Sequence, residues 1–226
     1  MRGRLSAVLI SGILSTWSCN VPPVPLSETP TKFSHSDGID GSWDSLGYQP
    51  GEHVPNFILY SAEGEPFRLD HELEKGKPIV LINGSYTCDV SRANLPAITS
   101  ITEKYKDSLN FFIIYTIDPH PADTVSPYSY DEKWEAPDNI RDSVYADQPR
   151  TYGERVALSK QWSEEYNIPA PVLIDSPDNI YWHYFGQAPN MAYIIDTDGI
   201  VYYKQAWFRE EELEEQIRNV MEDPDN

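Results

Sequence analysis

The residue best suited to covalent chemistry in this chain is Cys88, which ends the segment Gly84-Ser85-Tyr86-Thr87-Cys88. This segment follows an apolar run and precedes a pattern that predicts a helix. The N-terminus of a helix carries partial positive charge and free N–H groups, which together stabilise a thiolate. Cys88 is therefore a candidate nucleophile, although a lone cysteine at such a junction can equally be a small buried apolar residue.

Only the thiolate of a cysteine attacks an electrophile, so an active site has to lower the pKa of Cys88. The hydroxyls of Ser85 and Thr87, helix N–H groups or a nearby imidazole can do this. His120, at the end of a second apolar strand, is the candidate imidazole; it can protonate a leaving group or orient a substrate, or it is a solvated loop residue. Asp89 acts in the opposite direction, because a neighbouring negative charge disfavours the thiolate.

Three charged residues are candidates for supporting roles. Asp118 and Asp123 flank His120 and can orient its ring, although acids in so acidic a chain are usually solvated. Arg155 can steer an anionic substrate, although a surface ion pair is the simpler interpretation.

Several other kinds of site have no pattern in this sequence. The other four histidines lack metal-ligand spacing with one another and with Cys88, so no metal site is expected. The absence of a Cys-x-x-Cys pair argues against a dithiol oxidoreductase that completes its cycle internally. There is no Gly-rich phosphate loop, and no cofactor is expected. An external thiol reductant, either a small thiol or a thioredoxin-like protein, would have to regenerate Cys88.

The length and charge of the chain limit its organisation and its partners. With 226 residues it has room for one domain with tails, and its net charge of −19 would repel nucleic-acid phosphates, so no nucleic-acid partner is expected. No apolar run beyond the N-terminus is long enough to span a membrane. The sequence does not determine the oligomeric state, and a homodimer is compatible with it.

The N-terminal residues are typical of an export signal. Residues 1–19 combine Arg2 and Arg4 with a short apolar core and small residues, as in a secretory signal peptide. Their end also resembles a bacterial lipoprotein signal, in which Cys19 would be lipidated and become the new N-terminus. We therefore expect an exported protein of the cell envelope or periplasm, lipid-anchored through Cys19 or otherwise secreted. A lipid anchor of this kind would be the only contact with a membrane.

The rest of the chain predicts a tether followed by one domain. Residues 20–51 are rich in Pro, Ser, Asp and Gly without an apolar period, which predicts a flexible linker. Over 52–226 a hairpin is followed by apolar strands that alternate with helices, which is typical of an α/β layered sheet. Residues 119–150 lack periodicity and are long for a connection, so they are interpreted as a functional loop or an insertion.

The order of these elements resembles a thioredoxin-like fold of the peroxiredoxin and redoxin kind, with a central mixed β-sheet flanked by helices. Within that class the chain resembles the iodothyronine deiodinase family, whose signature is Gly-Ser-x-Thr-selenocysteine after an apolar strand. The residues that match this signature are Gly84, Ser85, Thr87 and Cys88, with Cys88 in the selenocysteine position. A second motif of the family is matched by Tyr115, Asp118, His120 and Asp123. A third is matched by Pro171, Asp175, Pro189 and Tyr193-Ile194-Ile195.

The resemblance implies a thiol redox function. Pro189 occupies the position of the cis-proline that lies beside the thiol in many thioredoxin folds, although it can also be an ordinary trans proline. The chain departs from the family where Asp89-Val90 replaces two prolines and where sulfur replaces selenium, the better nucleophile. The fold therefore transfers more safely than the substrate.

Three functions remain open. In the first, Cys88 attacks a small-molecule soft electrophile in a reductive dehalogenation. In the second, the chain is a one-cysteine peroxiredoxin-like peroxidase, although Leu81 stands where the peroxiredoxin pattern has Pro. In the third, the chain is a non-catalytic envelope module that binds a partner through the aromatic, acidic residues 128–134.

Overall fold

The centre of the fold is the apolar run before Cys88, which forms strand β3 (Ile79–Gly84) with every residue buried. A computed structural model describes residues 21–222 of the chain. In it β3 lies between β4 (Asn110–Tyr115), to which it is parallel, and β6 (Ala192–Ile195), to which it is antiparallel. A strand covered on both faces favours apolar residues on both, which explains the apolar run from Ile79 to Ile82.

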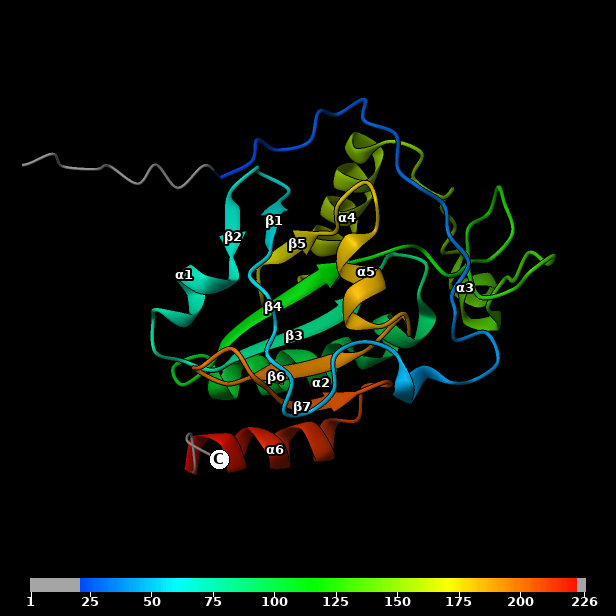
Figure 1. The fold of residues 1–226 in the computed structure, drawn as a ribbon. Helices are drawn as coiled ribbons and strands as arrows, with labels where there is room; N and C mark the ends of the chain where they lie inside the picture. Colours follow the sequence, from blue (N-terminus) through cyan, green and yellow to red (C-terminus); the bar gives the residue numbers. More distant parts are fainter. Residues whose placement is uncertain (1–20, 223–226) are drawn as a thin grey trace, which may run out of the picture.

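The other strands complete a mixed sheet in the order β2-β1-β5-β4-β3-β6-β7, in agreement with the fold class expected from the sequence (Figure 1). The four strands not yet described are β1 (Ile58–Ser61), β2 (Pro66–Arg68), β5 (Val172–Ile174) and β7 (Val201–Gln205). The helices are the 3-10 turn η1 (Trp43–Ser45), α1 (Leu69–Leu73), α2 (Asp89–Tyr105), α3 (Pro137–Asp142), α4 (Tyr152–Tyr166), α5 (Ile180–Phe185) and α6 (Glu210–Glu222). The predicted N-terminal hairpin is β1–β2.

Alternate residues of β3 face two separate hydrophobic clusters. Val80 and Ile82 pack with residues of α2, α4 and α6, whereas Ile79 and Leu81 pack with residues of α1 and α5 on the other face. The period of two in a strand requires this division. The sheet is thus the middle of three layers (Figure 1). Cys88 lies between the end of β3 and the start of α2.

The parallel pairing of β3 and β4 brings the two predicted catalytic motifs together. Gly84 pairs with Tyr115, so the carboxyl ends of both strands lie at the same edge of the sheet. α2 starts directly after Cys88, and the chain after β4 carries His120. Two motifs separated by some thirty residues are therefore neighbours, as in other open α/β sheets.

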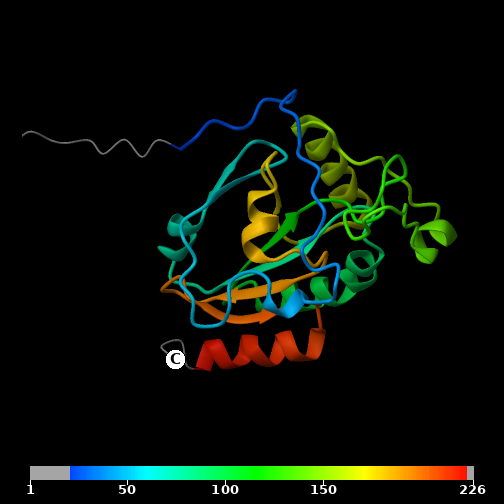
Figure 2. The same cartoon turned by 45° about the vertical axis from the view of Figure 1, so that its right-hand side comes forward.

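The described part of the predicted flexible linker is packed against the domain, which corrects the expectation for residues 20–51. The N–H of Thr31 donates to the carbonyl of Arg150 at 2.9 Å, and the N–H of Ser36 donates to the carbonyl of Pro127 at 2.8 Å. Figure 2 shows this segment, in dark blue, running beside the green loop. Its hydrogen bonds come mainly from the backbone, so its polar composition did not reveal them.

The segment 119–150 contains one short helix, α3, and is otherwise irregular, in keeping with the predicted insertion. The predicted signal peptide 1–19, with Cys19, lies outside the described residues. Within residues 21–222, no helix is both long enough and apolar enough to cross a lipid bilayer.

Candidate active site around Cys88

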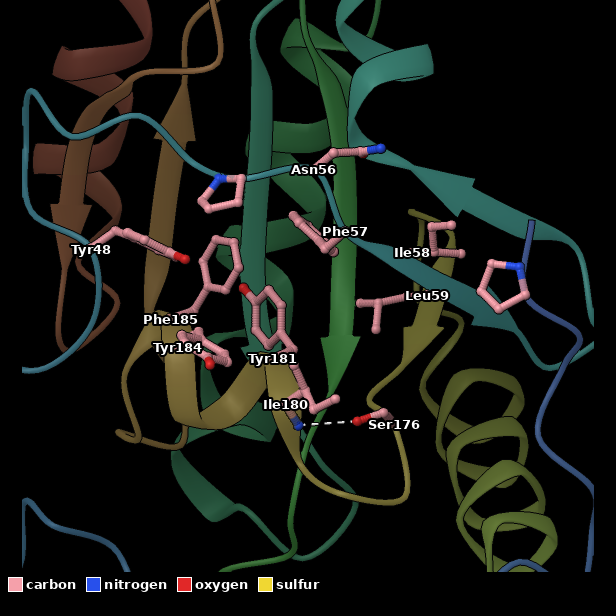
Figure 3. Close-up of a pocket in the computed structure, with 12 residues that line it drawn as sticks. Tyr48, Asn56, Phe57, Ile58, Leu59, Ser176, Ile180, Tyr181, Tyr184 and Phe185 are labelled. Carbon is pink, nitrogen blue, oxygen red and sulfur yellow. Dashed lines mark hydrogen bonds between the residues drawn. The ribbon is translucent and has the colours of Figure 1, made fainter. Parts of the chain in front are cut away.

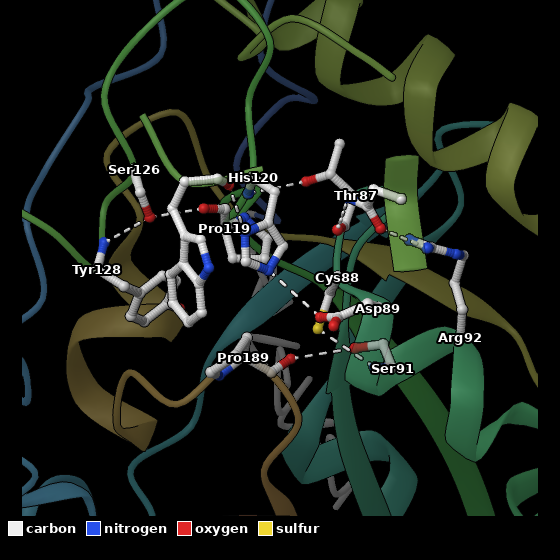
Figure 4. Close-up of polar contacts among 12 residues, drawn as sticks. Thr87, Cys88, Asp89, Ser91, Arg92, Pro119, His120, Ser126, Tyr128 and Pro189 are labelled. Carbon is white, nitrogen blue, oxygen red and sulfur yellow. Dashed lines mark hydrogen bonds and ion pairs between the residues drawn. The ribbon is translucent and has the colours of Figure 1, made fainter. Parts of the chain in front are cut away.

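Cys88 caps the N-terminus of α2 with its own side chain. The N–H of Ser91 donates a hydrogen bond to Sγ at 3.2 Å, and the chain enters the helix from an extended conformation at Cys88 (Figure 4). In the part of the chain that is described, Cys88 is a free thiol, and its side chain is 0% exposed. The predicted position at a strand-to-helix junction is confirmed. The expectation from the alternative interpretation, that the thiol is buried, is confirmed as well.

Burial raises the pKa of Cys88 to about 11, because the interior disfavours the charged thiolate. The hydrogen bond from Ser91 counteracts this in part, and the charge of Asp89 adds to the rise. The expected assistance from two hydroxyls is absent. The Ser85 hydroxyl is buried without a partner, and the Thr87 hydroxyl donates to Asp118. The predicted lowering of the thiol pKa is therefore wrong for this arrangement.

The ring of His120 is buried beside the start of α2 and has a contact at each nitrogen. Nδ1 lies 2.8 Å from the carbonyl oxygen of Trp134, and Nε2 lies 3.3 Å from Oδ1 of Asp89. The Trp134 ring meets the imidazole edge-on at a centroid distance of 4.7 Å. The side chain of His120 is 4% exposed, so the alternative interpretation as a solvated loop histidine is wrong.

Asp118 fixes the position of Thr87, the residue before Cys88. Its buried carboxylate accepts hydrogen bonds from the N–H of Thr87 at 2.8 Å, from the Thr87 hydroxyl at 2.9 Å and from the Tyr115 hydroxyl at 2.7 Å. The backbone N–H of His120 donates to the same Thr87 hydroxyl at 3.2 Å. Asp118 therefore positions His120 only through Thr87. Burial raises the pKa of the Asp118 carboxyl, while these donors oppose the rise.

Asp123 does not contribute to the cluster around Cys88. Its carboxylate accepts from the N–H of Gln148 at 2.9 Å and from the guanidinium of Arg150 at 2.8 Å. These contacts fasten the start of the 119–150 segment to its end. The predicted orienting role of Asp123 toward His120 is not supported by the structure.

Arg155 lies inside the protein and cannot steer a substrate from the surface. On α4 it is 0% exposed. Its guanidinium donates to the carbonyls of Asp175 and Ser176 at 3.2 and 2.7 Å and to Oδ1 of Asn179 at 2.7 Å. Its role is to fasten α4 to the chain between β5 and α5, so both the steering role and the surface ion pair are corrected.

Pro189 lies beside Cys88 and Ser91 (Figure 4), but the described residues contain no cis peptide bond. The ordinary trans alternative is therefore the one that the structure has. The carbonyl oxygen of Pro189 accepts a hydrogen bond from the Ser91 hydroxyl at 3.4 Å. This contact ties the loop before β6 to the first turn of α2.

Sequence reasoning missed three groups around the site. Asp89 was considered only as a charge next to the thiol, whereas it is also the partner of His120. Trp134 was considered only as part of the partner-binding residues 128–134, because it stands in an irregular segment fourteen residues from His120. Tyr128 donates from its hydroxyl to the carbonyl of Gln187 at 2.7 Å, and burial, together with the charges of Cys88 and Asp118, raises its pKa.

A hollow lies elsewhere, between α5, β1 and the chain just before β1. Its volume is about 580 Å³, and Figure 3 shows its largely aromatic and aliphatic walls. Residues that line it include Tyr48, Phe57, Ile58, Ile180, Tyr181 and Phe185. No predicted site residue belongs to its lining, so it does not extend the site around Cys88.

Comparisons with known proteins agree with this fold and motif arrangement. The model of the family described as "Iodothyronine deiodinase" matches residues 46–224. The type I iodothyronine deiodinase of Xenopus laevis is 24% identical over 152 residues, which are 67% of this chain and 55% of that protein. The type II enzyme of Gallus gallus is 25% identical over 169 residues, 74% of this chain and 53% of that protein. The chain thus spans about half the length of these relatives.

Among solved structures, a thiol:disulfide interchange protein from Bacteroides sp. superposes with a TM-score of 0.53 at 12% identity. The match covers 79% of this chain and 94% of that one, and it shows a shared thioredoxin-like fold. The family model covers most of the chain and includes both motifs at the sheet edge, so this protein belongs to the iodothyronine deiodinase family.

Proposed function

We propose that the protein is a single-cysteine thiol redox enzyme, in which Sγ of Cys88 attacks a soft electrophile and an external thiol restores it. The observation that carries the proposal is the placement of one thiol at the N-terminus of α2 with a buried imidazole beside the same helix turn. The only other cysteine of the sequence is Cys19, near the chain start. The resolving thiol therefore has to come from another molecule, either a small thiol or a thioredoxin-like protein.

The reaction that we assign to the site is reductive dehalogenation of an aromatic halide. The Cys88 thiol and the aryl halide form an Sγ–halogen bond and an aryl C–H bond, while the C–halogen and S–H bonds break. The sulfur is oxidised and the ring carbon is reduced. A first external thiol displaces hydrogen halide and forms a mixed disulfide with Cys88, and a second releases the free thiol and leaves an external disulfide.

The high pKa of Cys88 places a condition on this chemistry. At neutral pH the resting sulfur is a thiol, so its proton has to leave while the substrate is bound. Because Cys88 is fully buried, substrate also needs the side chains around it to move. Tyr128 and Trp134, both from the 119–150 segment, are the neighbours that such a movement would involve.

Turnover tests with two electrophiles decide the proposal. The protein in a Cys19→Ser background is compared with the same protein carrying Cys88→Ser, using dithiothreitol as reductant with either an iodinated phenol or a hydroperoxide. We expect iodide release that disappears with Cys88→Ser. Cys88-dependent consumption of peroxide without iodide release would replace dehalogenation by the peroxidase function. If neither substrate is consumed, the non-catalytic binding module is the function that remains.

We also propose that the protein is exported and held at the envelope through Cys19. The support is the charged and apolar pattern of residues 1–19 that ends in this cysteine. Labelled palmitate should enter the protein in a bacterial host and not its Cys19→Ser variant. Recovery of unlabelled protein in the soluble fraction would contradict the anchor.

A further inference from the structure

The contacts of His120 determine where its ring protons lie. The carbonyl oxygen of Trp134 can only accept a hydrogen bond, and it lies 2.8 Å from Nδ1. Nδ1 therefore carries a proton in this arrangement. In a neutral imidazole the other nitrogen would then be a bare acceptor, because only one of the two nitrogens is protonated.

The other nitrogen, however, faces a carboxylate. Nε2 lies 3.3 Å from Oδ1 of Asp89. An ionised carboxylate has acceptors only, and two acceptors do not attract each other at this distance, so one additional proton is needed between Asp89 and His120. The hydrogen bond with His120 is the largest cause that lowers the pKa of Asp89, which agrees with an ionised carboxylate and a proton on Nε2.

The surroundings of this pair favour the negative charge on Asp89. Asp89 is the first residue of α2, where the helix dipole stabilises an anion. Arg92, one turn further along α2, also favours the ionised form of Asp89. Its guanidinium donates hydrogen bonds to the carbonyl of Tyr86 and to Oδ1 of Asn139.

Other titratable groups approach the pair from each neighbouring element. Cys88 precedes Asp89 on α2 and is a protonated thiol at neutral pH. Asp118, after β4, reaches the backbone of His120 through the Thr87 hydroxyl. Tyr128, from the 119–150 segment, has its hydroxyl bonded to the carbonyl of Gln187. Unlike Asp89, none of these three side chains contacts a ring nitrogen of His120.

We propose that Asp89 is a positioning residue that holds His120 as an imidazolium with its Nε2 proton at the first residue of α2, next in sequence to Cys88, so that the pair is the proton store of the site. This inference rests on the proposed function of Cys88. In the dehalogenation step Nε2 gives its proton to the ring carbon that loses halogen, and the proton of the Cys88 thiol returns to the pair. Protons balance without a further acid or base.

The test reads the protonation of His120 directly, by long-range ¹H–¹⁵N spectra of histidine-labelled full-length protein at pH 7. His120→Gln identifies the resonances, and thermal unfolding confirms that each variant is folded. The variant is Asp89→Asn, and the matched control is Asp107→Asn, which removes an equal charge from an exposed residue beyond the C-terminal end of α2.

We expect both nitrogens of His120 to be protonated in the parent and in Asp107→Asn, and Nε2 to lose its proton in Asp89→Asn while Nδ1 keeps it. A bare Nε2 in the parent, or a protonated Nε2 in Asp89→Asn, would overturn the inference. The spectra do not depend on turnover. The expected spectra without Cys88-dependent turnover would refute the proposed function and support the Asp89–His120 pair. Cys88-dependent turnover without the expected spectra would refute the pair and support the proposed function.

Discussion

The ionisation of Cys88 gives the sharpest test of the site's electrostatics. Burial raises its pKa from the ordinary value of 9.0 to about 11. At pH 10 a thiol with the ordinary value would be about 90% thiolate, whereas a thiol with a pKa of about 11 would be about 10% thiolate. The perturbation to apply is therefore pH itself, between 7 and 10, where the two cases separate most clearly.

Ultraviolet absorbance of the thiolate is a suitable assay, because it needs no reagent to reach a buried sulfur. The spectrum of the Cys88→Ser variant is subtracted from that of the parent, both in a Cys19→Ser background, so that tyrosine ionisation cancels. We expect little thiolate absorbance up to pH 9.5. The same pair of proteins unfolded in urea is the control and should show the ordinary thiol titration.

The shifted pKa also predicts how stability depends on pH. Because the folded pKa lies above the unfolded one, the unfolded chain releases the thiol proton first as pH rises. The stabilising contribution of the neutral thiol is thus complete below pH 9 and is lost between pH 9 and 11, by up to about 3 kcal/mol. A thiolate that titrates in the folded protein with a midpoint below pH 8 would refute this reasoning, because the Ser91 N–H would then outweigh burial.

Two substitutions test the scaffold. In Gly84→Ala the new Cβ would overlap the buried ring of Trp162, so the free energy of unfolding in urea should fall by about 1–3 kcal/mol; an unchanged midpoint would show that the ring has room to move. Arg155→Met removes three buried hydrogen bonds and leaves the buried Asp175 without its nearby cation, for an expected loss of about 3–5 kcal/mol. A loss below 1 kcal/mol would contradict the role of Arg155 in fastening α4 to the chain after β5.

The placement of the site could be predicted from the sequence because it follows from strand order. An apolar run that ends at Gly84, and a second that ends near Tyr115, have to be neighbouring buried strands if the sheet is of the α/β kind. Parallel pairing then puts Cys88 and His120 at one edge, as the structure has them. Such patterns are local in the sequence, and most residues of both strands are buried.

The parts that were predicted wrongly depend on contacts between distant residues. The composition of residues 21–51 is that of a linker, yet their backbone groups form hydrogen bonds with loops about 90 or more residues further along. The sequence around Arg155 does not distinguish a buried cation from an exposed one, since its guanidinium donates to backbone carbonyls that no motif encodes. Burial of Cys88 is likewise decided by what packs over it.

Asp89 has two opposite effects on the reactive sulfur, and their balance explains why burial decides the state of Cys88. As an anion next to the thiol it disfavours the thiolate. As the partner of His120 in the proposed pair, it would keep an imidazolium beside the same helix turn. The neutral thiol is therefore set by desolvation, which a bound substrate and its movement of Tyr128 and Trp134 would change. In this chain, removal of the Asp89 charge alone would not produce a thiolate.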